Sequence, residues 1–81
     1  MKLPRGLKLF IADIVNEENY EQEIWYVIGK TYDSAFKRFT KEANSIWRTY
    51  LYYFNEANEE QIERSMKELG DEVVEGGIYY T

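Results

Sequence analysis

The fold of this chain is decided by the stretch Leu7-Lys8-Leu9-Phe10-Ile11-Ala12-Asp13-Ile14-Val15, which is rich in aliphatic, β-branched and aromatic residues. This composition predicts a β-strand that stops at the polar run 16–19. Apolar residues occupy both alternating sets of positions, so neither face of the strand is purely polar. We therefore expect a sheet whose second face is not simply exposed to water.

A second strand is predicted in the sequence Ile24-Trp25-Tyr26-Val27-Ile28, continuing through Gly29 to about Tyr32. The polar segment 16–23 separates it from the first strand. A connection of this length suits an antiparallel hairpin with a longer loop.

An amphipathic helix is predicted next, with Asp33 and Ser34 offering an N-cap. Its apolar stripe consists of Phe36, Phe39, Ala43, Ile46 and Trp47. Its opposite side carries the cations Lys37, Arg38 and Lys41. The spacing indicates a helix that buries the aromatic side and exposes the basic side.

The segment that follows this helix allows two interpretations. Residues 48–54 are rich in Tyr, Thr and Phe, which favours a third strand from about Trp47 after a break at Asn44-Ser45. Ile46, Tyr50 and Phe54 also continue the helical stripe, so a longer helix to Phe54 is the alternative. We prefer the strand, because any aromatic-rich run would satisfy that periodicity.

A second helix is predicted from its own end signals. Asn58 is the N-cap and Gln61 its capping-box partner, while Ala57 and Ile62 occupy the staple positions and Gly70 the stop. The predicted buried stripe is Ile62, Met66 and Leu69, and the predicted exposed i,i+4 ion pairs are Glu60 with Arg64 and Glu63 with Lys67. A last strand is expected from Val73 and Val74 through Tyr80, with a bulge or a tight hairpin at Gly76-Gly77.

These elements predict one small α+β domain over residues 1–81. We expect a mostly antiparallel sheet of about four strands in the order ββαβαβ, with both helices packed on one face. The 44% hydrophobic and 17% aromatic content supplies a core. The basic start and short apolar run lack a cleavage site, and no apolar run approaches a membrane span, so we expect a cytoplasmic protein.

The chain contains no histidine and no cysteine. Serine or cysteine triads, imidazole bases, disulfides and zinc or iron–sulfur ligation by these residues are therefore excluded. The acids at 17–23 lack the spacing of a calcium loop, and the glycines near the carboxyl end form no phosphate loop. We expect no enzymatic activity, no cofactor and no metal.

Charge is sorted into alternating basic and acidic blocks within a net charge of −5. The last block places acids on and after the second helix, at Glu56, Glu59, Glu60, Glu63, Glu68, Asp71, Glu72 and Glu75. Ordered carboxylates on a helix can meet a partner's Lys and Arg and so imitate nucleic acid. The alternative is an acidic face that only confers solubility.

Eight tyrosines provide a second candidate surface. In a regular third strand, Tyr50, Tyr52 and Phe54 alternate onto one face, and Trp47, Leu51 and Tyr53 onto the other. Both faces can hardly fit the core of so small a domain. We expect an outward aromatic face for a protein partner or a homodimer. A thick aromatic core is the alternative.

The sequence favours a non-catalytic protein-binding module, specifically a small acidic inhibitor of the kind that phages or mobile elements encode, in the anti-restriction or anti-CRISPR class. Its partner would present a basic surface to Glu56, Glu59, Glu60, Glu63, Asp71, Glu72, Tyr50 and Tyr52. The alternatives are a regulatory nucleic-acid-binding domain that uses the basic helix and the aromatic strand, and a structural homo-oligomer. A pI near 4.7 argues against nucleic acid as a ligand.

Overall fold

A central antiparallel sheet organises the computed structural model, which describes residues 3, 5–16, 20–46, 49–69 and 73–80. The strand order across the sheet is β3-β1-β2-β4. The elements are β1 (Lys8–Asn16), β2 (Gln22–Gly29), α1 (Tyr32–Ile46), β3 (Thr49–Glu56), α2 (Glu59–Leu69) and β4 (Ile78–Tyr80). The predicted α+β class and the ββαβαβ order are confirmed.

The two predicted amino-terminal strands form the centre of the sheet. β1 pairs with β2 from Lys8 opposite Gly29 to Val15 opposite Gln22, as an antiparallel hairpin. β2 ends at Gly29, so the prediction that it reaches about Tyr32 is wrong. Tyr32 instead opens α1.

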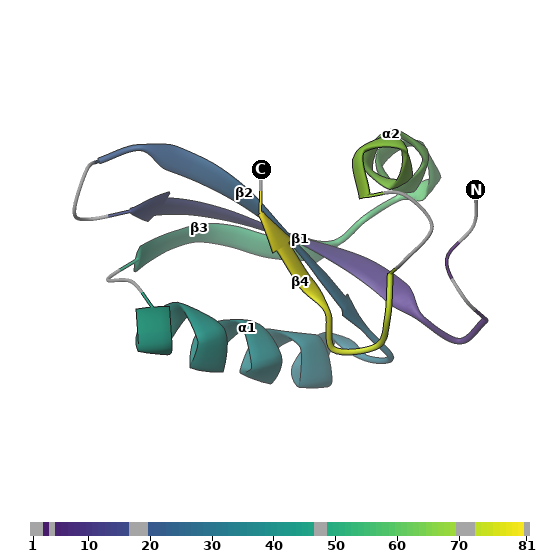
Figure 1. Ribbon diagram of the computed structural model, residues 1–81, viewed down its shortest axis with the longest axis horizontal. Coiled ribbons are helices and arrows are strands. Elements are labelled where there is room, and N and C mark those ends of the chain that lie inside the picture. Colours follow the sequence, from purple (N-terminus) through teal and green to yellow (C-terminus); the bar gives the residue numbers. More distant parts are fainter. Residues whose placement is uncertain (1–2, 4, 17–19, 47–48, 70–72, 81) are drawn as a thin grey trace.

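The two helices lie on opposite faces of the sheet, so the prediction that both pack on one face is wrong (Figure 1). Alternation along β1 is the physical cause. Phe10, Ala12 and Ile14 are buried with α1 residues, whereas Leu9 and Ile11 are buried with Met66 of α2. The expectation that the second face is not simply solvated is therefore confirmed.

The face under α1 is built from aromatic rings. Phe10 stacks on Phe54 with ring centroids 5.7 Å apart, and Trp25 meets Phe39 of α1 edge to face at 5.4 Å. Phe36 packs partly buried against the same cluster. Such ring pairs stabilise a core beyond the area they remove from water, so a chain of this length gains a substantial core on this face alone.

The face under α2 is mainly aliphatic. Leu9 and Ile28 are buried there beside Met66 and Ala57, and Val73 closes one side of the cluster. Ile62 and Leu69 pack against it, which confirms the predicted stripe of α2. The sheet is therefore sandwiched between two hydrophobic layers.

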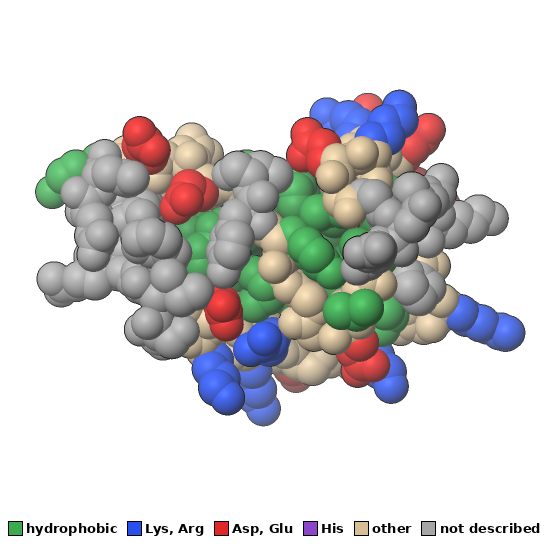
Figure 2. Space-filling view, in the orientation of Figure 1, with side chains coloured by type: hydrophobic (Ala, Val, Ile, Leu, Met, Phe, Trp, Pro, Cys, Tyr) green, Lys and Arg blue, Asp and Glu red, His purple; other side chains and the backbone are tan. Residues whose placement is uncertain are grey.

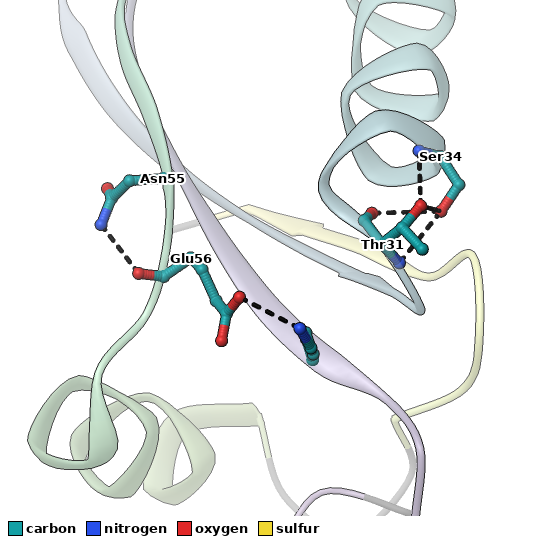
Figure 3. Close-up of polar contacts among 5 residues, drawn as sticks. Thr31, Ser34, Asn55 and Glu56 are labelled. Carbon is teal, nitrogen blue, oxygen red and sulfur yellow. Dashed lines mark hydrogen bonds and ion pairs between the residues drawn. The ribbon is translucent and has the colours of Figure 1, made fainter.

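Thr31 caps α1, so the predicted N-cap at Asp33 or Ser34 is wrong. The Ser34 amide donates to Thr31 Oγ1 at 3.1 Å, and the Thr31 amide donates to Ser34 Oγ at 3.3 Å (Figure 3). This reciprocal pair satisfies two amide groups at the start of the helix. A Cβ atom added at Gly29 would lie 3.1 Å from Ala35 Cβ, so Gly29 allows the first turn of α1 to approach β2 closely.

The predicted capping box of α2 is confirmed. The Gln61 amide donates to Asn58 Oδ1 at 2.9 Å, and the Asn58 amide donates to Gln61 Oε1 at 3.0 Å. The staple residues Ala57 and Ile62 belong to one hydrophobic cluster. Gly70 lies outside the described residues.

We expect Asn58→Ala to lower the free energy of unfolding by about 1 kcal/mol, because the Gln61 amide loses its acceptor. Thermal melting followed by circular dichroism would show a midpoint about 4–8 °C lower. Asn58→Asp keeps an oxygen acceptor and serves as the matched control. Equal midpoints for the Ala and Asp variants would show that the cap contributes nothing.

β3 is a strand, as preferred, and the alternative of a helix continuing to Phe54 is wrong. α1 extends to Ile46 rather than breaking at Asn44-Ser45. The pairing of β3 with β1 shifts by one residue, because Asp13 pairs with Tyr53 and Ile14 with Leu51. This β-bulge leaves Tyr52 without a partner on β1 and interrupts the strict alternation assumed from the sequence.

The carboxyl-terminal strand is shorter than predicted, since Val73 and Val74 precede it as loop residues. The Gly77 amide donates to the Val74 carbonyl at 3.0 Å, and Gly76 has a φ of 78°. This is a β-turn with glycine at the position that requires positive φ. The turn leads from loop into β4, so it is neither of the two predicted features, a bulge or a strand-to-strand hairpin.

Candidate protein-binding groove

A groove opens between α2 and the sheet. Its volume is about 360 Å³, and it opens to solvent beside Tyr53, which is 44% exposed. Three strands supply the floor and one side of α2 supplies a wall. The lining residues are Ile11, Ile24, Tyr26, Tyr53, Gln61, Arg64, Ser65 and Glu68. We call this feature the α2 groove.

The groove exists because α2 is shorter than the sheet face beneath it. α2 buries Leu9 and Ile11, in the first half of β1. Farther along the sheet, Ile24, Tyr26 and Tyr53 remain partly or largely exposed. An eleven-residue helix rises about 16 Å, while an eight-residue strand spans about 27 Å. The uncovered length therefore becomes the groove floor.

Cross-strand pairing places the groove's apolar side chains together. Ile11 is opposite Tyr26, and Asp13 is opposite both Ile24 on one side and Tyr53 on the other. Directly opposed residues in antiparallel strands point to the same face. The exposed rings of Tyr26 and Tyr53 thus share one surface, although β2 and β3 are not neighbours.

The helix wall adds polar groups of both signs. Arg64 and Glu68 are one turn apart on α2, and within the described part of the chain neither forms an ion pair. Ser65 is 5% exposed and lies between them in sequence. An apolar floor beside a few polar groups is the arrangement that recognises a side chain together with its backbone.

The predicted acidic residues are partly brought together. Glu59, Glu60 and Glu63 are exposed on α2. Glu56 is bound to Lys8 at 3.4 Å, at the end of β3. Asp71 and Glu72 lie outside the described residues, so their predicted contribution stays a prediction.

The surface of α2 is mixed rather than uniformly acidic. Arg64 and Lys67 are exposed among its acids, and red and blue side chains intermingle over this helix in Figure 2. The predicted ion pairs of Glu60 with Arg64 and of Glu63 with Lys67 are wrong, since neither appears among the described residues. Charges of both signs therefore remain available to a partner.

The predicted aromatic face on β3 is only partly testable. The backbones of Tyr50 and Tyr52 lie in β3, but their side chains lie outside the described ones. Phe54, expected on the same outward face, is only 8% exposed and belongs to the core under α1. Tyr53 is the exposed residue instead, on the face of α2. The bulge after Leu51 is the physical reason why simple alternation fails.

Sequence reasoning missed several groove residues, including Tyr26, Ile24 and Glu68 as site candidates. A usable signal was present for Tyr26, because the predicted hairpin places residues of the first two strands opposite each other. No local signal showed that α2 would end short of Ile24. That depends on the relative lengths of two elements distant in sequence.

The basic side of α1 is remote from the groove. Lys37 and Lys41 are exposed on α1, and Arg38 contacts Glu42 at 3.6 Å. Phe39 on the same helix points into the opposite core. The exposed cations and the exposed Tyr53 therefore lie on opposite sides of the sheet, an arrangement that does not suit joint binding of phosphates and bases.

Among the residues that the structure describes, no group of three or more acidic side chains is close enough to hold a metal ion. The same residues include no helix that is both long and apolar enough to cross a membrane.

Comparisons of this chain with protein families, with curated proteins and with solved structures found no match.

Proposed function

We propose that the protein is a non-catalytic binding module that recognises another protein through the α2 groove. The observation that carries this proposal is the pair of partly exposed rings, Tyr26 and Tyr53, in an open groove bordered by Arg64 and Glu68. Tyrosine and arginine are enriched where interfaces gain most of their affinity. The groove would accept an aliphatic or aromatic side chain of the partner.

The size of the groove supports a macromolecular partner over a cofactor. Its volume of about 360 Å³ is at the low end of the roughly 300–1,000 Å³ typical of small-molecule pockets. Such a space holds one or two side chains. The exposed acids of α2 would then surround the contact as a polar rim.

The charge of the rim favours a partner with a basic surface. The net charge is −5, and Glu59, Glu60 and Glu63 are exposed beside the groove. Complementary charge speeds association more than it strengthens the final complex. Inhibition of a partner by covering a surface that binds phosphates, as an acidic inhibitor encoded by a phage or mobile element would do, is included in this proposal.

We expect Tyr53→Ala to weaken partner binding by about 1–3 kcal/mol, because a ring that covers the groove floor is lost. Tagged protein would isolate partners from cell lysate, and calorimetry with the isolated partner would measure the affinity. Tyr20→Ala is the matched control, since Tyr20 is 84% exposed in the loop between β1 and β2. It should leave affinity unchanged.

Two further outcomes separate the parts of this proposal. A double reversal, Glu60→Lys with Glu63→Lys, should slow association and reduce its dependence on salt. Equal affinity of the Tyr53→Ala and Tyr20→Ala variants would remove the groove from the interface. A mobility shift of DNA or RNA at low micromolar protein and about 0.15 M salt would favour the nucleic-acid alternative.

A further inference from the structure

β3 occupies one edge of the sheet. It is eight residues long, and in the described part of the chain no strand pairs with its outer side. The strand at the opposite edge, β4, has three residues. A long edge strand offers unpaired backbone groups to another strand.

The second half of this edge is already closed. The Ala57 amide donates to the Leu9 carbonyl, so the peptide groups of residues 57 and 55 face β1 and those of residues 56 and 54 face outward. Tyr32 Oη donates to the Phe54 carbonyl at 3.2 Å, and Asn55 Nδ2 donates to the Glu56 carbonyl at 2.9 Å (Figure 3 shows the second bond). Both outward carbonyls therefore have side-chain donors.

The first half of the edge has a different character. The sequence Thr49-Tyr50-Leu51-Tyr52-Tyr53 contains no charge, no proline and no glycine, and its residues favour strands. We propose that this half-strand pairs with the same half-strand of a second copy, forming a two-fold dimer with one continuous sheet. The capped carbonyls at Phe54 and Glu56 limit the length of the pairing.

The chemistry of β3 favours an identical strand as its partner. Antiparallel pairing about a two-fold axis brings the beginning of one strand to the end of the other. In sequence a cation, Arg48, precedes β3 and an anion, Glu56, ends it, so the two copies present opposite charges to each other. The uncharged residues between them meet without repulsion.

The dimer leaves the α2 groove open. The pairing edge lies in the plane of the sheet, whereas the groove lies on the face that α2 covers. Each dimer would therefore carry two grooves, and dimerisation does not depend on the proposed protein-binding function.

Sedimentation equilibrium of the purified protein, from about 10 µM to 1 mM, tests the proposal directly. We expect reversible dimerisation of the unaltered chain. Tyr52→Lys adds a charge at the bulge residue, which has no partner on β1, and should weaken the dimer at least tenfold. Tyr20→Lys makes the same chemical change in the exposed hairpin loop and should leave dimerisation unchanged. Circular dichroism checks that both variants remain folded.

Tyr32→Phe provides a change in the opposite direction. It keeps the ring that stacks on Phe36 but removes the hydroxyl that covers the Phe54 carbonyl. A longer edge then becomes available, and we expect a dimer about three- to tenfold tighter. A monomer at 1 mM for both the unaltered chain and Tyr32→Phe would overturn the proposal, as would equal dimerisation by Tyr52→Lys and Tyr20→Lys.

Discussion

Replacing Phe10 by alanine is expected to lower the free energy of unfolding by about 3–5 kcal/mol. Phe10 is fully buried, stacks on Phe54 and meets Tyr32 edge to face at 6.0 Å. Its removal leaves a cavity that three elements border, and none of them can fill it without breaking other ring contacts. A domain of 81 residues has a total stability of roughly 4–12 kcal/mol, so much of the population should unfold.

Urea unfolding followed by tryptophan fluorescence would measure this effect, since Trp25 lies in the same cluster. Tyr20→Ala removes an aromatic ring that is 84% exposed and should change stability by less than about 0.5 kcal/mol. A loss below about 1 kcal/mol for Phe10→Ala would mean that the aromatic layer under α1 is not tightly packed.

The second large effect is expected at the neighbouring position. Leu9→Ala should lower the free energy of unfolding by about 2–5 kcal/mol, because Leu9 is fully buried on the opposite face with Ile28 and Met66. Phe10 and Leu9 are adjacent in sequence but belong to different hydrophobic layers. Two large losses at consecutive positions occur only where both faces of a strand are covered.

The same urea titration would decide this prediction, with Val74→Ala as the control. Val74 is 60% exposed, so its truncation should have little effect on stability. If Leu9→Ala cost less than about 0.5 kcal/mol, Leu9 would lie on a solvated face. The arrangement of helices on both faces would then be refuted.

The secondary structure could be predicted where its signals are local. The capping box of Asn58 and Gln61 spans four residues, and the structure forms both of its hydrogen bonds. The strand propensity of residues 49–54 correctly outweighed their helical periodicity. The cap of α1 was misplaced, since Asp33 is as good a cap residue as Thr31 and the choice depends on where β2 ends.

The candidate site could be predicted only in part. The exposure of Glu60 and Glu63 follows from the amphipathic pattern of α2. The exposure of Tyr53 and the burial of Phe54 depend on the bulge against Asp13 and Ile14, which no residue pattern announces. A shift of one residue reverses which side chains face the core.

The sequence by itself determined the number, type and order of the elements, because caps, turns and hydrophobic periods act over a few residues. It also determined that β1 is apolar on both sides, at Leu9 and Ile11 as well as at Phe10 and Ala12. Only the tertiary structure decided that α1 and α2 take opposite faces and that α2 leaves Tyr26 and Tyr53 uncovered. A helical pattern specifies which side of the helix is buried but not which face of a distant sheet buries it, and that choice depends on packing among residues far apart in the chain.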